Sequence, residues 1–276
     1  MNVTDRRRLL GPSNAKSANI PETRTSSPSK RSEDEIRKMF LKTGLVGNAN
    51  GSAYLEVDDT IIEVSVFGPR PIKGSFIDRA SFSVECKFLP HIPQPNEETF
   101  KNQSGSASNV RTGLTTVEQK LSSYIETAFL HSIILEKYPK STIDVFVTII
   151  SADTTSSSNK SLLNLCNWVS NCTSLALVDS GIEVKDMVTS GQVSLNKSTN
   201  KILMDPDYSN NYSEDDSVDC VCSYMNMLND VVVGFWIDGN QDDLDEQTMQ
   251  KLFENCNGMS KKIRSNFNSY LRGTIE

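Results

Sequence analysis

The sequence contains no apolar run of the length that a membrane-spanning helix needs, which is about 18 residues. Its first twelve residues include a run of three arginines and lack the apolar stretch of a secretory signal. From these two absences we expect an intracellular protein without a membrane partner.

Histidine is also scarce, with two residues in 276. His91 lies in a proline-rich stretch and His131 in a helical pattern, which argues against Ser/His/Asp or Cys/His catalysis. Only Cys220 and Cys222 are close-spaced, and neither histidine is placed to complete a zinc site with them. We expect no metal site and no cofactor. We also expect reduced, buried side chains for all six cysteines, the others being Cys86, Cys166, Cys172 and Cys256.

Basic residues are absent from residues 205–250, which contain twelve acidic residues. The net charge of the chain is −7, and because residues 1–42 contribute +5, the remainder carries −12. A protein that coats nucleic acid needs a basic face, so this class is disfavoured, whereas a small basic lining inside a larger assembly is compatible with these charges. Residues 1–42 are rich in Ser, Pro and charge. We expect a disordered basic tail there and a folded domain over residues 43–276.

Hydrophobic periodicity predicts an α+β domain in which two sheet-and-helix halves are fused. Residues 79–88 alternate as a strand of an antiparallel sheet with one dry side, and residues 142–151 predict a central strand buried on both faces. Residues 162–180 have the period of a helix with one buried stripe. The other predicted strands are residues 52–57, 61–67, 182–188, 192–195, 201–204, 218–227 and 231–237, and the other helices are residues 115–137, capped by Thr115 or Thr116, and 245–270.

A polar loop over residues 153–160 leads from the central strand into the following helix. Phosphate sites are often built where a strand leads into the amino terminus of a helix. An anion cradle needs glycines and cations, but this loop has no glycine and one cation, Lys160. The residues therefore favour an ordinary polar turn.

Several motifs occur in an order that resembles the RNase PH-like family of phosphorolytic ribonucleases and exosome ring subunits, over residues 43 to about 270. They are residues 43–44 (TG), 50–53 (NGSA) with Glu56, 66–70 (VFGPR), 138–139 (YP) with 143–145 (IDV) and Asp153, 175–182 (LALVDSGI), 204–208 (MDPDY) and 214–215 (ED). The resemblance implies an RNase PH-like fold.

Active members of that family, as the resemblance implies, hold phosphate with a Gly-Gly-Arg loop and carry an aspartate pair followed by an asparagine. This sequence departs from both patterns. The loop after Asp153 has neither Gly-Gly nor Arg. Asp215 and Asp219 are nearest to the pair but more closely spaced, and Cys220 follows where the asparagine is expected. The helix at 115–137, which is arginine-rich in active members, has only lysines, Lys120 and Lys137.

The resemblance and these departures together predict a catalytically inactive structural subunit of the RNA exosome ring. Such a subunit supports 3′-to-5′ RNA processing and degradation, including rRNA processing, by partner subunits and helps to form the RNA-threading channel. The implied partners are other RNase PH-like ring subunits, S1/KH-type cap subunits, a catalytic hydrolytic ribonuclease and the RNA itself. The implied locations are nucleus, nucleolus and cytoplasm. Candidates for RNA contact are Lys73, Arg79, Arg111 and Lys120.

Two alternatives remain open at the level of sequence. The first is a divergent phosphate-dependent 3′ exoribonuclease that uses Asp215 and Asp219 with Mg²⁺, while Arg111, Lys120 or Lys160 engages phosphate. Further carboxylates that could hold the ion are Asp205, Asp207 and Asp216, although a solvated acidic loop explains them more simply. The second alternative is a free-standing acidic interaction protein.

Overall fold

A computed structural model describes residues 35–74, 76–92, 114–152, 159–197, 201–206, 217–239 and 245–275. These residues belong to one compact unit, residues 31–276. Residues 1–34 of the predicted tail at 1–42, residues 93–113, and residues 153–158 of the polar loop at 153–160 lie outside the described residues. Within the described ranges, no helix is long and apolar enough to cross a membrane.

The first sheet has five strands in the order β1-β2-β3-β5-β4. Neighbouring strands are antiparallel except β4 and β5, which are parallel. The prediction of an antiparallel sheet is therefore wrong for residues 79–88. The chain crosses from β4 to β5 through helix α2, and parallel neighbours need such a crossover. The elements are β1 (Met39–Thr43), β2 (Gly51–Val57), β3 (Thr60–Pro71), β4 (Ser81–Phe88), α2 (Thr116–Leu130) and β5 (Ser141–Ser151).

Strand β5 lies between β3 and β4, which confirms its predicted central position. Its burial alternates, however: Val145 and Val147 are buried, whereas Phe146 between them is exposed. The expectation that both faces are buried is wrong, because in the described residues α2 and α3 pack on one side of this sheet.

The fold begins before residue 43. Strand β1 pairs with β2 from Met39↔Val57 to Thr43↔Ala53, and the side chain of Arg37 is buried. The boundary between residues 42 and 43 is therefore corrected: residues 37–42 belong to the folded domain. This five-residue strand is too short, and too closely flanked by charged residues, to give a clear periodic signal.

Helix α2 begins with a capping box. The backbone N–H of Glu118 donates to Thr115 Oγ1, and the backbone N–H of Thr115 donates to the Glu118 carboxylate. This confirms the predicted cap. The predicted end at residue 137 is wrong, since the helix stops at Leu130 and Ile133 instead forms a β-bridge with Val184.

The second sheet is antiparallel, with the order β7-β6-β8-β9. The strand predicted at 182–188 is wrong, because only its last residue, Val188, lies in a strand, while Val184 forms an isolated bridge and a bend follows it. Asn229 and Asp230, which connect the last two strands, both have positive φ, as a tight hairpin turn requires. The strands are β6 (Val188–Asn196), β7 (Lys201–Met204), β8 (Ser217–Met225) and β9 (Val231–Asp238).

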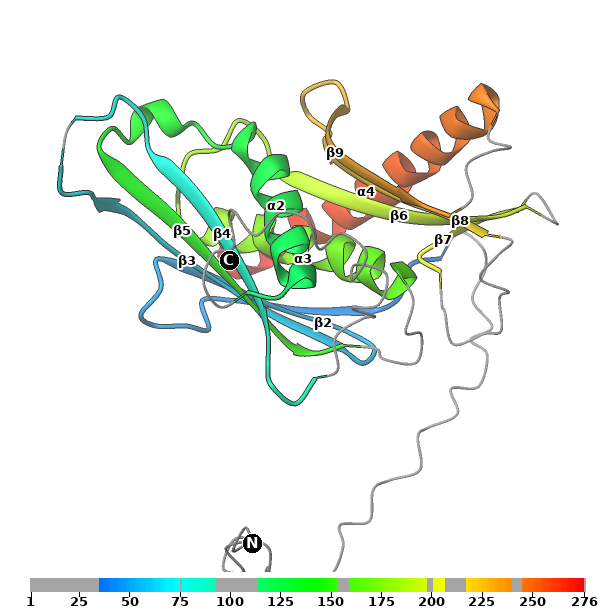
Figure 1. Ribbon diagram of the computed structural model, residues 1–276, viewed down its shortest axis with the longest axis horizontal. Helices are drawn as coiled ribbons and strands as arrows, with labels where there is room; N and C mark the ends of the chain where they lie inside the picture. Colours follow the sequence, from blue (N-terminus) through cyan, green and yellow to red (C-terminus); the bar gives the residue numbers. More distant parts are fainter. Residues whose placement is uncertain are drawn as a thin grey trace, which may run out of the picture. The chain divides into compact units, whose positions relative to one another are not determined.

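Helix α3 (Asn159–Asp179) lies between the two sheets, and helix α4 (Glu246–Ile275) packs on the second sheet (Figure 1). Helix α3 contacts β2 and β3 of the first sheet and β6 and β8 of the second. Residues 162–177 are accordingly buried on every side. The single buried stripe predicted for this helix is wrong, because a helix between two sheets has no solvent-facing side. The predicted α+β class with two sheet-and-helix halves is confirmed.

Polar contacts join helix α3 to the second sheet. The side-chain amide of Asn171 donates to the carbonyl of Ser190 at 3.2 Å and accepts the Ser190 N–H at 3.0 Å. On strand β6, a Cβ atom at Gly191 would lie 2.2 Å from the backbone oxygen of Cys256. Glycine therefore allows α4 to approach β6 closely, and β6 is held between the two helices.

Candidate functional site

Asp205, one of the carboxylates considered for Mg²⁺, is held by Arg37. The guanidinium Nε lies 2.9 and 3.0 Å from the two carboxylate oxygens and Nη2 lies 2.6 Å from Oδ1. The backbone N–H of Arg37 donates to Oδ2 at 2.8 Å. The side chains are 7% and 0% exposed. Asp205 thus joins the amino-terminal segment to the end of β7, a structural role that competes with metal binding.

Two residues of helix α3 complete this contact. Asn164 Oδ1 accepts a hydrogen bond from Arg37 Nη2 at 2.7 Å and another from Trp168 Nε1 at 2.9 Å. The guanidinium also lies over the Trp168 ring, 5.6 Å from its centroid. Sequence reasoning missed Arg37 because 168 positions separate it from Asp205.

Asp219 lies inside the second sheet, and its side chain is buried. In register it faces Ser194 on β6 and Asp238 on β9. Alternation along β8 puts it on the same side as Ser223, whose hydroxyl lies 2.9 Å from that of Tyr124 on α2. Its proposed partner Asp215, like Asp207 and Asp216, falls outside the described residues. Mg²⁺ in proteins usually keeps several of its waters. For Asp219 to bind such a hydrated ion beside an RNA strand, the side chains that bury Asp219 would have to move apart.

The cations predicted to contact RNA do not form one cluster. Lys73 and Arg79 are exposed in the connection between β3 and β4, and Arg79 lines a surface pocket of about 560 Å³ with His131 and Lys185. Lys120 is half-buried on α2, and this burial lowers its pKa. Arg111 lies outside the described residues.

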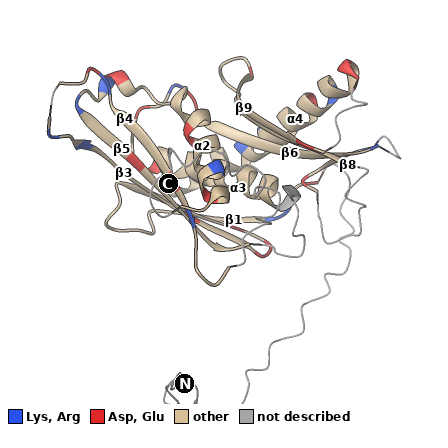
Figure 2. Cartoon of the chain, viewed as in Figure 1, with Lys and Arg blue, Asp and Glu red and all other residues tan. Residues whose placement is uncertain are grey.

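Strand β4 separates these cations. Arg79 lies just before the first residue of β4. Lys120 lies near the other end of the strand, because the N–H of Phe88, the last residue of β4, donates to Glu118 in the same turn of α2 at 2.9 Å. Eight strand residues span about 26 Å at 3.3 Å each. Lys and Arg are likewise spread over several elements in Figure 2. Within the described residues, we therefore find no site where these candidates converge on one phosphate.

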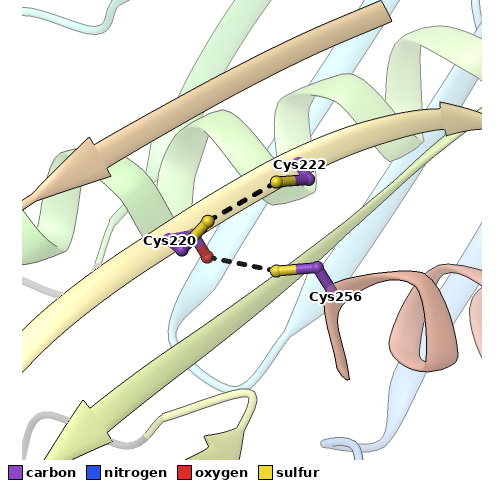
Figure 3. Close-up of side chains that lie close together, drawn as sticks. All are labelled: Cys220, Cys222 and Cys256. Atoms are coloured by element: carbon purple, nitrogen blue, oxygen red, sulfur yellow. Dashed lines mark hydrogen bonds between the residues drawn. The ribbon is translucent and has the colours of Figure 1, made fainter. Parts of the chain in front are cut away.

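Three cysteines meet between β8 and α4. Cys220 and Cys222 project from the same face of β8, with their sulfurs 3.4 Å apart, and Cys256 reaches them from α4 (Figure 3). The expectation of buried, unbridged cysteines is confirmed for all six. Sequence reasoning did not predict that Cys256 joins Cys220 and Cys222. The signal is the helical spacing of Leu252, Cys256 and Met259, which puts the three side chains on one buried face of α4.

An apolar surface surrounds the β8–β9 hairpin. We call it the hairpin surface and define it as Met227, Leu228, Val231, Val232 and Phe235, all exposed large hydrophobic residues. Within the described part of the chain, β9 is an edge strand of the second sheet. Exposed apolar side chains beside an unpaired strand edge are typical of a surface that another protein covers.

Known proteins share both sequence and fold with this chain. Residues 35–183 match the model of the 3′ exoribonuclease family, domain 1 (RNase PH). Over 237 residues the chain is 34% identical to the exosome complex component mtr3 of Schizosaccharomyces pombe, covering 83% of this chain and 82% of that protein. In the sequence, residues 5–12 (DRRRLLGP) and 68–76 (GPRPIKGSF) predict a likeness to the fungal mtr3 subunit. The identity over 237 residues confirms this prediction.

Two solved structures have the same fold. Rice (Oryza sativa) Rrp46 superposes with a TM-score of 0.68 at 17% identity, covering 88% of this chain and 98% of that one. A chain of the Archaeoglobus fulgidus exosome with RNA bound to the active site gives a TM-score of 0.62 at 18% identity, covering 86% and 91%.

Proposed function

Because this chain belongs to the RNase PH family, we propose that it is a catalytically inactive structural subunit of the RNA exosome ring. Its partners are other RNase PH-like ring subunits, S1/KH-type cap subunits and the hydrolytic ribonuclease that degrades the RNA. In this role the chain helps to form the channel through which RNA passes. The proposal extends to action in the nucleus, nucleolus and cytoplasm, which fluorescence of a tagged chain in living cells would test.

The hairpin surface is the observation that carries this proposal. Val232 pairs with Tyr224 and Phe235 with Cys222 on β8, and both partners belong to the cluster that packs on α4. Val232 and Phe235 therefore share the α4 side of the edge strand. Met227 and Leu228 extend the surface at the hairpin turn. A related ring subunit would cover these side chains.

The arrangement of charge supports a structural role over a phosphorolytic one. Phosphorolysis must hold inorganic phosphate beside an RNA backbone, which requires several converging cations or helix-end dipoles. Among the described residues, the candidate cations are spread along β4, and Arg37 binds Asp205. Asp219, the described member of the proposed carboxylate pair, is 1% exposed.

Assembly is tested by substitutions in the hairpin surface. Phe235→Asp and Val232→Asp, made singly, should weaken co-purification with related ring subunits by about 30-fold or more, since central interface residues contribute about 2 kcal/mol or more. Phe76→Asp is the matched control, because Phe76 is 73% exposed, against 61% for Phe235, and lies between β3 and β4. Equal retention of all three variants would show that the hairpin surface is not the interface.

Catalysis is tested with the purified chain and a labelled RNA in the presence of phosphate and Mg²⁺. We expect no nucleoside diphosphate release, with a phosphorolytic relative as positive control. Release that stops with Asp219→Ala would establish the alternative, a divergent 3′ exoribonuclease using Asp215 and Asp219. A chain that sediments in extract as a monomer would instead favour the free-standing interaction protein.

A further inference from the structure

The three cysteines between β8 and α4 form the only group of metal-ligating side chains of this kind in the described residues. Their sulfur atoms all lie within 4.8 Å of one another, and all three side chains are fully buried. They come from two elements, since Cys220 and Cys222 lie on β8 and Cys256 lies on α4 (Figure 3). The group is independent of the proposed exosome function.

The spacing of the sulfurs fits a shared metal ion. A metal–thiolate bond of about 2.3 Å places ligand sulfurs about 3.8 Å apart in a tetrahedral site and about 4.0 Å apart in a trigonal one. The Cys220 and Cys222 sulfurs are 3.4 Å apart, and the largest separation in the group is no more than 4.8 Å. Adjustments of less than 1 Å, within the reach of side-chain rotation, would bring three sulfurs to one ion.

The surroundings restrict the choice of ion. The cluster packs against Val193, Leu195, Val218 and Leu252, and no histidine or carboxylate belongs to the group. Zn²⁺ in structural sites takes four ligands. Cu(I) is a soft ion that thiolates select, and three sulfurs around it complete a trigonal site. We propose that Cys220, Cys222 and Cys256 form a Cu(I) site that links strand β8 to helix α4.

The proton chemistry is compatible with such a site. Each thiol that binds Cu(I) loses its proton in doing so, so the affinity should rise with pH. Burial raises the pKa of Cys256, whose Sγ lies 3.6 Å from the Cys220 carbonyl oxygen.

The test uses the full chain, reduced and kept free of oxygen, and Cu(I) delivered from a competing chelator such as bicinchoninate. We expect one ion per chain and an X-ray absorption spectrum that reports sulfur ligands at about 2.3 Å. Cys256→Ala should lower the Cu(I) affinity by more than about 100-fold, because loss of a second-shell partner alone costs 10–100-fold. Cys172→Ala is the matched control, since Cys172 is equally buried but lies in the other core cluster.

Three results would overturn the proposal. They are equal Cu(I) binding by the Cys256→Ala and Cys172→Ala variants, retention of Zn²⁺ in preference to Cu(I), and no Cu(I) uptake by the wild type, which would mean that the three thiols only fill the core. The absorption spectrum and uptake of the wild type decide the question even if Cys256→Ala does not fold.

Discussion

Replacing Arg37 by methionine should destabilise the protein far more than replacing an exposed arginine. Methionine keeps an apolar stem but removes the guanidinium, which leaves the carboxylate of Asp205 buried without its cation. Removing one partner of a buried ion pair costs about 3–5 kcal/mol. For comparison, Arg70→Met removes a pair with Asp144 in which the arginine side chain is 52% exposed, and such pairs contribute about 0–1 kcal/mol.

The assay is urea unfolding followed by circular dichroism. With a slope of about 3 kcal/mol per molar, Arg37→Met should lower the midpoint by more than about 1 M. The double variant Arg37→Met/Asp205→Asn should recover part of the loss, because it removes the buried charge and asparagine tolerates the positive φ of 48° at this position. A cost for Arg37→Met no larger than that of Arg70→Met would refute the reasoning, as would a double variant that is no more stable than the single one.

Two other predictions concern packing and pH. Gly191→Ala should cost about 1–3 kcal/mol, because its Cβ would meet the α4 backbone, whereas Gly47→Ala, with no atom within 4 Å, should change the urea midpoint little. A hydrogen bond from Lys261 lowers the pKa of Asp230 to about 2, below its unfolded value near 4, so the resulting stability should be present above pH about 4 and lost as pH falls towards 2. Lys261→Met should make the free energy of unfolding depend less on pH, as measured by urea titrations between pH 5 and pH 2. The change should be less than about 1 kcal/mol, because the pair is exposed. An unchanged pH dependence would show that Lys261 does not lower the pKa of Asp230.

The elements with strong local signals could be predicted from the sequence. The alternation at 79–88 and the capping residue Thr115 both identify elements that the structure contains. What failed depends on tertiary context. The sequence near 79–88 is compatible with either strand direction, and only the crossover through α2 makes β4 parallel to β5. The complete burial of α3 arises from the second sheet, which the helix's own periodicity does not reveal.

The candidate site was less predictable, because carboxylates with different roles look alike in sequence. Asp205 and Asp219 were both plausible metal ligands by residue type and spacing. Asp205 is fixed by a distant arginine from a segment assigned to the tail, and Asp219 is buried by the pairing of β8 with β6 and β9. To predict that Cys256 joins Cys220 and Cys222, one must know which face of β8 the last helix covers. The sequence does not show this packing.

The ion pairs limit which cations of this protein are available to contact RNA phosphates. Several described cations contact carboxylates: Arg37–Asp205, Arg70–Asp144, Lys137–Glu183, Lys261–Asp230 and Arg264–Asp186. A phosphate that bound to one of these cations would have to displace a carboxylate of the same charge sign, and in the buried pairs it would leave that carboxylate unneutralised. Under the proposed function, RNA contacts would therefore fall to cations outside these pairs, and among the described residues Lys73 and Arg79 are exposed. Lys73 and Arg79 both precede β4, whereas a phosphorolytic site would need several cations that converge on one anion.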